Sequence, residues 1–425
     1  MAVFTFNRGL LMRKIGRVCT CSAPMRSIRL PPMPTIRDLL LLYKLQAQKR
    51  LSQNFLLDLR LINKIAKASS FKSRPLQGFH AVEVGPGPGG ITRALLNNGA
   101  DHITVIEKDP RFKPLLEMLA EASEGRLTIY WGDVLSFDMS KMFPEEMRLD
   151  WAEGELYLDQ EREEWTVQEE EETWRPHRGQ RVKGRIPKML LVGNLPFNIS
   201  TPLVVRWMKD ISNRANIWSY GRVPLTLTFQ KEVAERIVAK VGEEQRCRLS
   251  VMCQNWCYVD HKFDISGSAF IPKPKVDVGV VRLVPRPEPI IPLPFAMVEK
   301  VLRTFFSYRQ KFIKHAAANL FPPCKGDEGS KFPSREDMVD EFFLISGVNP
   351  NIRAFRTTLE EFKRLCGAYQ KMCERYPGVE KFEYRGPKGL DFTDDFDEEK
   401  LEKKWEGFDD AVGKFDQKLY SSVHQ

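Results

Sequence analysis

The middle of the chain alternates between two patterns of apolar residues. Short, continuous apolar runs are typical of buried strands, and they occur at 81–84, 102–106, 127–131, 189–192 and 225–229. Between and after them, apolar residues recur every three or four positions, as on one face of a helix, at 91–97, 110–122, 202–209 and 231–240. This alternation predicts an α/β fold in which helices cover both faces of a parallel sheet.

Helical spacing also occurs on either side of this alternating region. Further helices are predicted at 35–49, 59–68, 295–306, around Phe342 and at 359–369. The first two precede the strands, and the others follow them as a separate group. We therefore expect a sheet domain over 35–288 and a small helical domain over 289–375.

Two stretches do not fit either pattern. Residues 145–187 are Glu-rich and then Arg/Lys-rich without a sustained apolar period, which predicts a long charged loop inserted between two strands. Loops of this length are uncommon inside compact domains, and this argues against the prediction. Residues 376–425 carry 13 acidic and 8 basic side chains and are predicted to form a disordered acidic tail.

Charge is distributed unevenly along the chain. The formal net charge is +9, although 145–172 contains 13 acidic and only 2 basic residues and the tail is acidic as well. The rest of the chain is therefore strongly basic, which is typical of a protein that binds nucleic acid. A basic surface that serves only solubility is the alternative.

The first 37 residues contain seven Arg or Lys and no Asp or Glu. Such a leader is typical of a mitochondrial transit peptide, which we assign to 1–34, and it indicates a protein of the mitochondrial matrix. A basic arm that contacts RNA is the alternative. No uncharged apolar run reaches the roughly 18 residues of a membrane-spanning helix, so no membrane insertion is predicted. Cys253 and Cys257 have no matching His or Cys pair, so no metal site is expected.

A glycine-rich turn follows the first predicted strand. Gly85, Gly87 and Gly90 formally satisfy the G-x-G-x-x-G pattern of dinucleotide-binding proteins. Pro86 and Pro88, however, lack the backbone N–H groups with which such a loop holds a pyrophosphate. The turn favours a cofactor without phosphate, such as S-adenosylmethionine, which needs only close approach to the glycine backbone. An NAD-dependent dehydrogenase is a weaker alternative, since no hydride-transfer histidine is evident.

Acidic residues follow the next two predicted strands. The carboxyl ends of parallel strands meet on one side of an open α/β sheet, where ligands bind, so Glu107 and Asp133 are candidate cofactor contacts. An ionised carboxylate only accepts hydrogen bonds, and Glu107 is expected to accept both ribose hydroxyls, with Lys108 beside the adenine. Asp133 is expected to accept the adenine amine while Val134 packs on the ring. Each acid alone could instead be an ordinary residue facing solvent.

The turn after the fourth predicted strand carries the most specific pattern, Asn194, Leu195, Pro196 and Phe197. The exocyclic amine of a base is a poor nucleophile because its lone pair is delocalised into the ring. If the Asn194 side-chain oxygen and the Leu195 carbonyl accept its two N–H groups, the lone pair is aimed at a methyl donor. Pro196 stiffens the turn, and Phe197 offers a ring on which a flipped-out base can stack. A simple strand-ending turn is the alternative.

Together these motifs resemble the ribosomal RNA adenine dimethyltransferase family. The similarity covers about 30–144 and 188–375 and includes 51–58, 83–92, 107–108, 132–134, 193–197, 226–235 and 270–279. It implies a Rossmann-like class I methyltransferase sheet with a small C-terminal RNA-binding helical domain. It also implies S-adenosyl-L-methionine as cofactor and dimethylation of N6 of two adjacent adenosines in a hairpin loop of mitochondrial small-subunit ribosomal RNA.

The resemblance further implies the roles of individual residues. The segment that lines the methionine side of the cofactor corresponds to Gln53, Asn54 and Leu56. The remaining cofactor contacts correspond to Gly85, Glu107, Lys108, Asp133, Val134 and Asn194. Phe270 matches the aromatic residue that stacks on the target adenine opposite Phe197. A hydrophobic anchor in a proline-rich loop is the alternative for Phe270.

The chain departs from the family pattern in two respects. The charged insert and the acidic tail are longer than usual, and Phe197 stands where relatives often have Tyr. The implied partner is the RNA of the assembling mitochondrial small ribosomal subunit, on which the protein acts as a monomer. A non-enzymatic alternative stays open, namely a transcription or assembly factor that binds mitochondrial RNA polymerase or nucleic acid independently of methylation.

Overall fold

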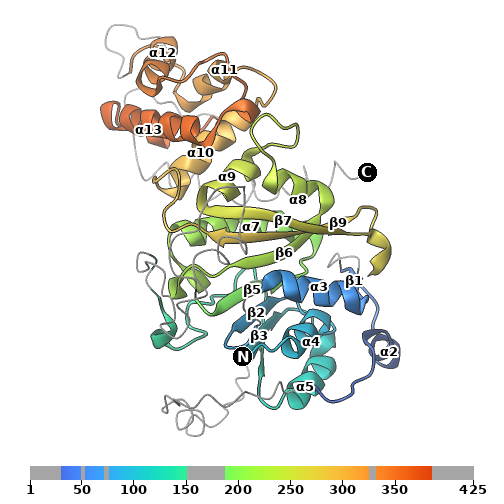
Figure 1. Ribbon diagram of the computed structural model, residues 1–425. Coiled ribbons are helices and arrows are strands. Elements are labelled where there is room, and N and C mark those ends of the chain that lie inside the picture. The colour runs from blue at the N-terminus through green and yellow to red at the C-terminus, as the bar shows by residue number, and fades with distance from the viewer. Residues whose placement is uncertain are drawn as a thin grey trace, which may run out of the picture.

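The computed structural model describes residues 30–48, 53–70, 76–149, 151, 187–324 and 332–384. A seven-stranded sheet with helices on both faces forms the larger part, and a group of helices lies beyond the β7 edge of the sheet (Figure 1). The predicted leader up to residue 29, most of the predicted charged insert and the predicted tail from residue 385 lie outside the described residues.

The strands of the main sheet follow the order β4-β3-β2-β5-β6-β9-β7. Their bounds are His80–Val84 (β2), His102–Glu107 (β3), Leu127–Trp131 (β4), Met189–Gly193 (β5), Leu225–Gln230 (β6), Cys257–Ile265 (β7) and Val278–Pro285 (β9). The five predicted strands, β2 to β6, are confirmed and pair in parallel. Their carboxyl ends therefore lie on the same side of the sheet.

Strands β7 and β9 are absent from the pattern-based prediction, and they run antiparallel to their neighbours. In β7 the apolar pattern is broken by Asp260, His261 and Lys262, which are all half-buried. Only a three-residue 3-10 helix (Gly267–Ala269) and the short strand β8 (Phe270–Ile271) separate β7 from β9, so the strand–helix alternation that reveals the other strands is missing here. The sheet is therefore mixed: the five predicted strands are parallel, and the two strands at this edge, which the pattern does not predict, are antiparallel.

The helices that pack on the sheet are α3 (Leu59–Ser69), α4 (Gly90–Asn97), α5 (Lys113–Ala122), α7 (Phe197–Ser212), α8 (Lys231–Val238) and α9 (Arg248–Trp256). Most lie where the apolar spacing predicts, but α7 begins earlier and continues through Pro202, and α9 is not predicted. The helix predicted at 35–49 is only Ile36–Leu42 (α2). It ends early because Lys44 adopts a left-handed φ of 52°.

The predicted helical domain consists of α10 (Phe295–Phe306), α11 (Ile313–Ala317), α12 (Arg335–Ser346) and α13 (Leu359–Arg375). Its apolar core continues into that of the sheet, since Phe342 of α12 and Trp207 of α7 belong to one cluster of buried side chains. At the junction, the rings of Trp256 and Phe295 lie 5.1 Å apart between centroids. The helical group is therefore packed firmly onto the sheet.

The packed region extends past residue 376, where the tail is predicted to begin. Val379 and Phe382 are buried. Lys300 Nζ, on α10, donates hydrogen bonds to the backbone carbonyls of Glu380 and Phe382. The first residues of the predicted tail therefore belong to the helical group as far as Tyr384, the last residue described.

Close packing between β9 and α8 predicts a large effect of a single methyl group. A Cβ on Gly279 would lie 2.4 Å from the Cβ of Ala234, far inside normal contact distance. We expect Gly279→Ala to lower the free energy of unfolding by about 1–3 kcal/mol, the usual cost of overpacking a core. Denaturant titration measures this change.

Gly367 provides the control for that substitution. It lies inside α13, and a Cβ there would meet nothing within 4 Å. Gly367→Ala should raise the free energy of unfolding by roughly 0.5–1 kcal/mol, because alanine loses less backbone entropy than glycine when it enters a helix. If both substitutions changed stability in the same direction, the packing argument would be contradicted.

Candidate functional site

A cleft opens at the carboxyl ends of β2, β3 and β5. It is lined by residues 53–56, by the glycine-rich turn and the start of α4, by Glu107, and by the turn after β5. Because these parallel strands end on the same side of the sheet, segments far apart in the sequence meet here. The predicted site residues that line the cleft are Gln53, Asn54, Leu56, Gly85, Gly87, Glu107, Asn194, Leu195, Pro196 and Phe197.

The glycine-rich turn after β2 presents its backbone to the cleft. Gly85, Gly87 and Gly89 have positive φ angles of 65°, 53° and 81°, which glycine adopts without strain. A Cβ on Gly85 would meet nothing within 4 Å, so a ligand can approach the backbone closely at this point. Pro86 and Pro88 contribute no N–H group, and the turn is therefore poorly suited to holding phosphate.

Glu107 ends β3 with its carboxylate bonded to the surrounding backbone. Oε2 accepts the N–H of Gly87 at 3.0 Å, and Oε1 accepts those of Lys108 at 2.8 Å and Asp109 at 2.7 Å. Burial raises the pKa of this carboxyl, and the three N–H groups act in the opposite direction. A carboxylate has about four acceptor positions, and three of those of Glu107 are occupied. The two ribose contacts expected from the sequence would need two free positions, and about one remains.

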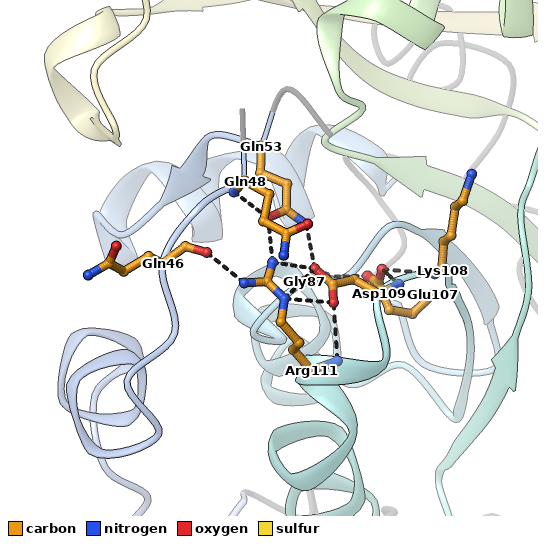
Figure 2. A network of polar contacts seen from close by, with 8 residues as sticks. All are labelled: Gln46, Gln48, Gln53, Gly87, Glu107, Lys108, Asp109 and Arg111. Carbon is orange, nitrogen blue, oxygen red and sulfur yellow. Dashed lines mark hydrogen bonds and ion pairs between the residues drawn. The ribbon is translucent and has the colours of Figure 1, made fainter. Parts of the chain in front are cut away.

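Gln53 is held by two residues that the sequence analysis does not single out (Figure 2). Its Nε2 donates to Asp109 at 2.9 Å, and its Oε1 accepts from Arg111 at 3.1 Å. Arg111 also donates to Asp109 at 2.9 Å and to the backbone carbonyl of Gln46 at 2.9 Å. Asp109 followed by Pro110 signals a helix start in the sequence, but nothing in that pattern predicts a contact with Gln53.

The predicted contacts Lys108, Asp133 and Val134 are not among the residues that line the cleft. Lys108 Nζ lies 2.6 Å from Asp133 Oδ2, and Asp133 Oδ1 accepts the N–H of Leu135 at 3.0 Å. Burial alone would raise the pKa of Asp133, but these two donors together hold it below its ordinary value. Asp133 is therefore ionised at neutral pH, and an adenine amine would have to share it with Lys108.

Asn194 is held at both ends of its side-chain amide. Its nitrogen donates to the Asn54 carbonyl at 3.1 Å, and its Oδ1 accepts the hydroxyl of Thr228 at 2.7 Å. Thr228 lies on β6, and the sequence pattern gives no reason to select it. Leu195 is buried, and Phe197 begins α7 with its ring half-buried against the core.

Phe270 lies away from the cleft lining. With Ile271 it forms the short strand β8, which pairs antiparallel with β1 (Phe55–Leu56). Its side chain is 2% exposed and packs in the same cluster as Leu56. In this arrangement Phe270 anchors its loop, and its ring has no open face on which a base could stack opposite Phe197.

Glu83 is a buried acid that the sequence analysis does not single out as a site residue. It lies on β2, is 1% exposed and lines the cleft, and its Oε2 accepts the Thr92 hydroxyl at 2.6 Å. Burial raises the pKa of Glu83 to about 8; the Thr92 hydroxyl lowers it and the charge of Glu107 raises it. At neutral pH this carboxyl is therefore mostly protonated.

Other kinds of site are not found in the part of the chain that the structure describes. There, no group of three His, Cys, Asp or Glu side chains is placed to hold a metal ion, and no helix is long and apolar enough to cross a membrane. Cys253 and Cys257 are buried, and burial raises the pKa of both thiols. Neither is poised to react as a thiolate.

Comparison with known proteins agrees with these features. The profile of the family described as "Ribosomal RNA adenine dimethylase" matches residues 44–331. Mitochondrial dimethyladenosine transferase 1 of Xenopus tropicalis is 41% identical over 357 residues, which cover 84% of this chain and 90% of the relative. The Homo sapiens protein of the same name is 40% identical over 374 residues, which cover 88% and 93%.

A crystal structure of a dimethyladenosine transferase from Plasmodium falciparum has a similar fold. The TM-score is 0.50 at 21% sequence identity, and the match covers 74% of this chain and 96% of that one. The chain thus has a Rossmann-like methyltransferase fold, and the resemblance inferred from the motifs is confirmed. Since both the family profile and the curated relatives span the sheet and the cleft, the chain belongs to the ribosomal RNA adenine dimethylase family.

Proposed function

We propose that this chain uses S-adenosyl-L-methionine to dimethylate N6 of two adjacent adenosines in a hairpin loop of mitochondrial small-subunit ribosomal RNA, supporting ribosome assembly. The observation that carries the proposal is that the glycine-rich turn and the turn at 194–197 line one cleft. The names of the relatives support a dimethyladenosine product. Unpaired loop bases can enter such a cleft, whereas the deep groove of duplex RNA hides them.

The side of the cleft around the glycine-rich turn fits a cofactor without phosphate. The left-handed glycines and the open space at Gly85 permit close approach, and the prolines withhold the N–H groups of a phosphate cradle. S-adenosylmethionine supplies an electrophilic methyl group on a sulfonium. The residues that we assign to its binding are Gln53, Asn54, Leu56, Gly85, Gly87, Glu107, Lys108, Asp133, Val134 and Asn194.

The other side of the cleft fits a planar amine. Thr228 uses one acceptor position of Asn194 Oδ1, and a carbonyl oxygen has a second. That position and the Leu195 carbonyl would accept the two N–H groups of the target, so that its lone pair faces the cofactor side. Phe197 would stack on the base, and Pro196 would stiffen the turn that carries Phe197. Phe270 could stack on the opposite face of the base only if the β1–β8 pair opened.

We place the protein in the mitochondrial matrix, as a monomer on the assembling small ribosomal subunit. The first 37 residues, with seven Arg or Lys and no Asp or Glu, support import, and the names of the relatives include the word mitochondrial. The helical group at 289–375 is proposed to bind RNA. Its rigid packing on the sheet supports this role, because RNA held there keeps a fixed position relative to the cleft.

Removing the Asn194 amide tests the methylation directly. We expect Asn194→Ala to lower kcat/KM by about 10²–10³-fold, because a group that positions the reacting amine is lost. Full-length protein is incubated with S-adenosylmethionine and small ribosomal subunits that lack the modification, and N6,N6-dimethyladenine is quantified by mass spectrometry.

Asn198→Ala is the matched control, since Asn198 is exposed on the first turn of α7 and does not line the cleft. It should methylate like the wild type and unfold at the wild-type temperature. Asn194→Ala also loses the contacts with Asn54 and Thr228, so it should remain folded with a slightly lower unfolding temperature. A wild-type protein that produced no methylated adenine would overturn the proposed function. That result would favour the alternative of a factor that binds mitochondrial RNA polymerase or nucleic acid without methylating it.

The contacts around Gln53 predict a remote effect on cofactor affinity. Arg111→Ala removes the guanidinium that holds Gln53 and Asp109 together, and we expect the Kd for S-adenosylmethionine to rise about tenfold, the effect of losing one hydrogen bond to a charged group. Titration calorimetry measures the Kd. The control is Arg60→Ala, because Arg60 is exposed and pairs only loosely with Asp58 at 3.7 Å. Equal affinities of the two variants would rule out this positioning role.

A further inference from the structure

The Thr228 hydroxyl is a buried group in contact with the proposed catalytic turn. Thr228 is 1% exposed on β6, and its hydroxyl lies 2.7 Å from Asn194 Oδ1. The two residues are neighbours because β5 and β6 pair in parallel up to Gly193 and Leu227. Asn194 and Thr228 therefore each come directly after the last residue that pairs β5 with β6.

The partners of Asn194 determine which way its amide faces. The Asn54 carbonyl can only accept a hydrogen bond, so the atom that faces it at 3.1 Å must be the amide nitrogen. The amide oxygen then faces Thr228, and because that oxygen can only accept, the hydroxyl must donate to it. If the amide were turned over, its oxygen would face the Asn54 carbonyl without a hydrogen between them.

We propose that Thr228 is a positioning residue that fixes the direction of Asn194 Oδ1, and that the second methyl transfer depends on it most. This inference rests on the proposed function. Each transfer forms a carbon–nitrogen bond while the methyl–sulfur bond of the sulfonium donor breaks with its electrons going to sulfur, and the amine then releases one proton. The target therefore loses one N–H group at each transfer.

The loss of N–H groups makes the two transfers unequal. The primary amine of adenine can be held by two acceptors, Asn194 Oδ1 and the Leu195 carbonyl. After the first transfer only one N–H remains, and a single hydrogen bond must aim the lone pair. When Oδ1 is fixed by Thr228, that hydrogen bond has a defined direction. Without the Thr228 hydroxyl, the amide is held only by the Asn54 carbonyl, and the direction of Oδ1 is less closely defined. The first transfer still has the Leu195 carbonyl, whereas the second depends on the single N–H group that we assign to Oδ1.

The test measures monomethylated and dimethylated adenine separately. Full-length wild type, Thr228→Val and Thr228→Ser are compared on small ribosomal subunits with S-adenosylmethionine, and calorimetry gives the Kd of the cofactor for each. Thr228→Val keeps the shape of the side chain but removes the hydroxyl, and Thr228→Ser restores it. The control is Thr226→Val, since Thr226 lies two residues earlier on the same face of β6 and is 3% exposed.

We expect Thr228→Val to slow the second transfer about three- to tenfold, the effect of one neutral hydrogen bond. N6-monomethyladenine should accumulate, the cofactor Kd should stay unchanged, and Thr228→Ser and Thr226→Val should give mainly dimethylated product. The inference is overturned if Thr228→Val gives the wild-type product ratio. It is also overturned if both valine variants slow both transfers equally, since that pattern marks a structural role. A wild type that methylates nothing would instead remove the proposed function itself.

Discussion

The hydrogen bond from the Asn194 amide to the Asn54 carbonyl joins segments 140 residues apart, and the shape of the cleft depends on it. The segment at 53–56 contains only the two-residue strand β1, which cannot hold its own position. Three contacts hold it from outside: Asn194 on one side, Asp109 and Arg111 on another, and the pairing of β1 with β8. Each comes from a different part of the fold. The pairing of β2 with β5 sets the two sides of the proposed active site beside each other, and this segment completes the cleft between them.

The charge of the cleft depends on how deeply its acidic side chains are buried as well as on how many there are. Glu83 and Glu107 both line it, at 1% and 6% exposure. The three backbone N–H groups that Glu107 accepts offset only part of the cost of burying its charge, so its pKa is still raised. Glu83 has a single hydroxyl partner, and its pKa is raised to about 8. The Glu107 carboxyl is committed to its own backbone neighbours Lys108 and Asp109 and, through Gly87, to the glycine-rich turn.

Apolar periodicity predicts the five parallel strands because it reports burial, and burial is what those strands have in common. It fails for β7, whose middle carries half-buried polar residues, and for the end of α2, where the backbone angle of Lys44 leaves no mark in the pattern. The strand-end motifs place seven of the predicted site residues in one cleft because parallel topology brings them together. The other three, Gln53, Asn54 and Leu56, are predicted only through the family resemblance. Asp109, Arg111 and Thr228 could not be found in this way. Their importance lies in contacts with distant segments, and no spacing rule encodes such contacts.

The continuity of the core between the sheet and the helical group has a consequence for RNA recognition. An RNA-binding domain connected by a flexible linker loses orientational freedom each time its bound RNA enters the cleft. Here Trp256 meets Phe295 at the junction, and Arg246 adds a hydrogen bond to the Thr357 carbonyl at 3.3 Å. Arg309 of the helical group donates back to the Arg246 carbonyl at 3.0 Å. The helical group therefore loses its orientational freedom once, during folding. For RNA bound to the proposed RNA-binding helices, the distance and orientation of the cleft are already fixed.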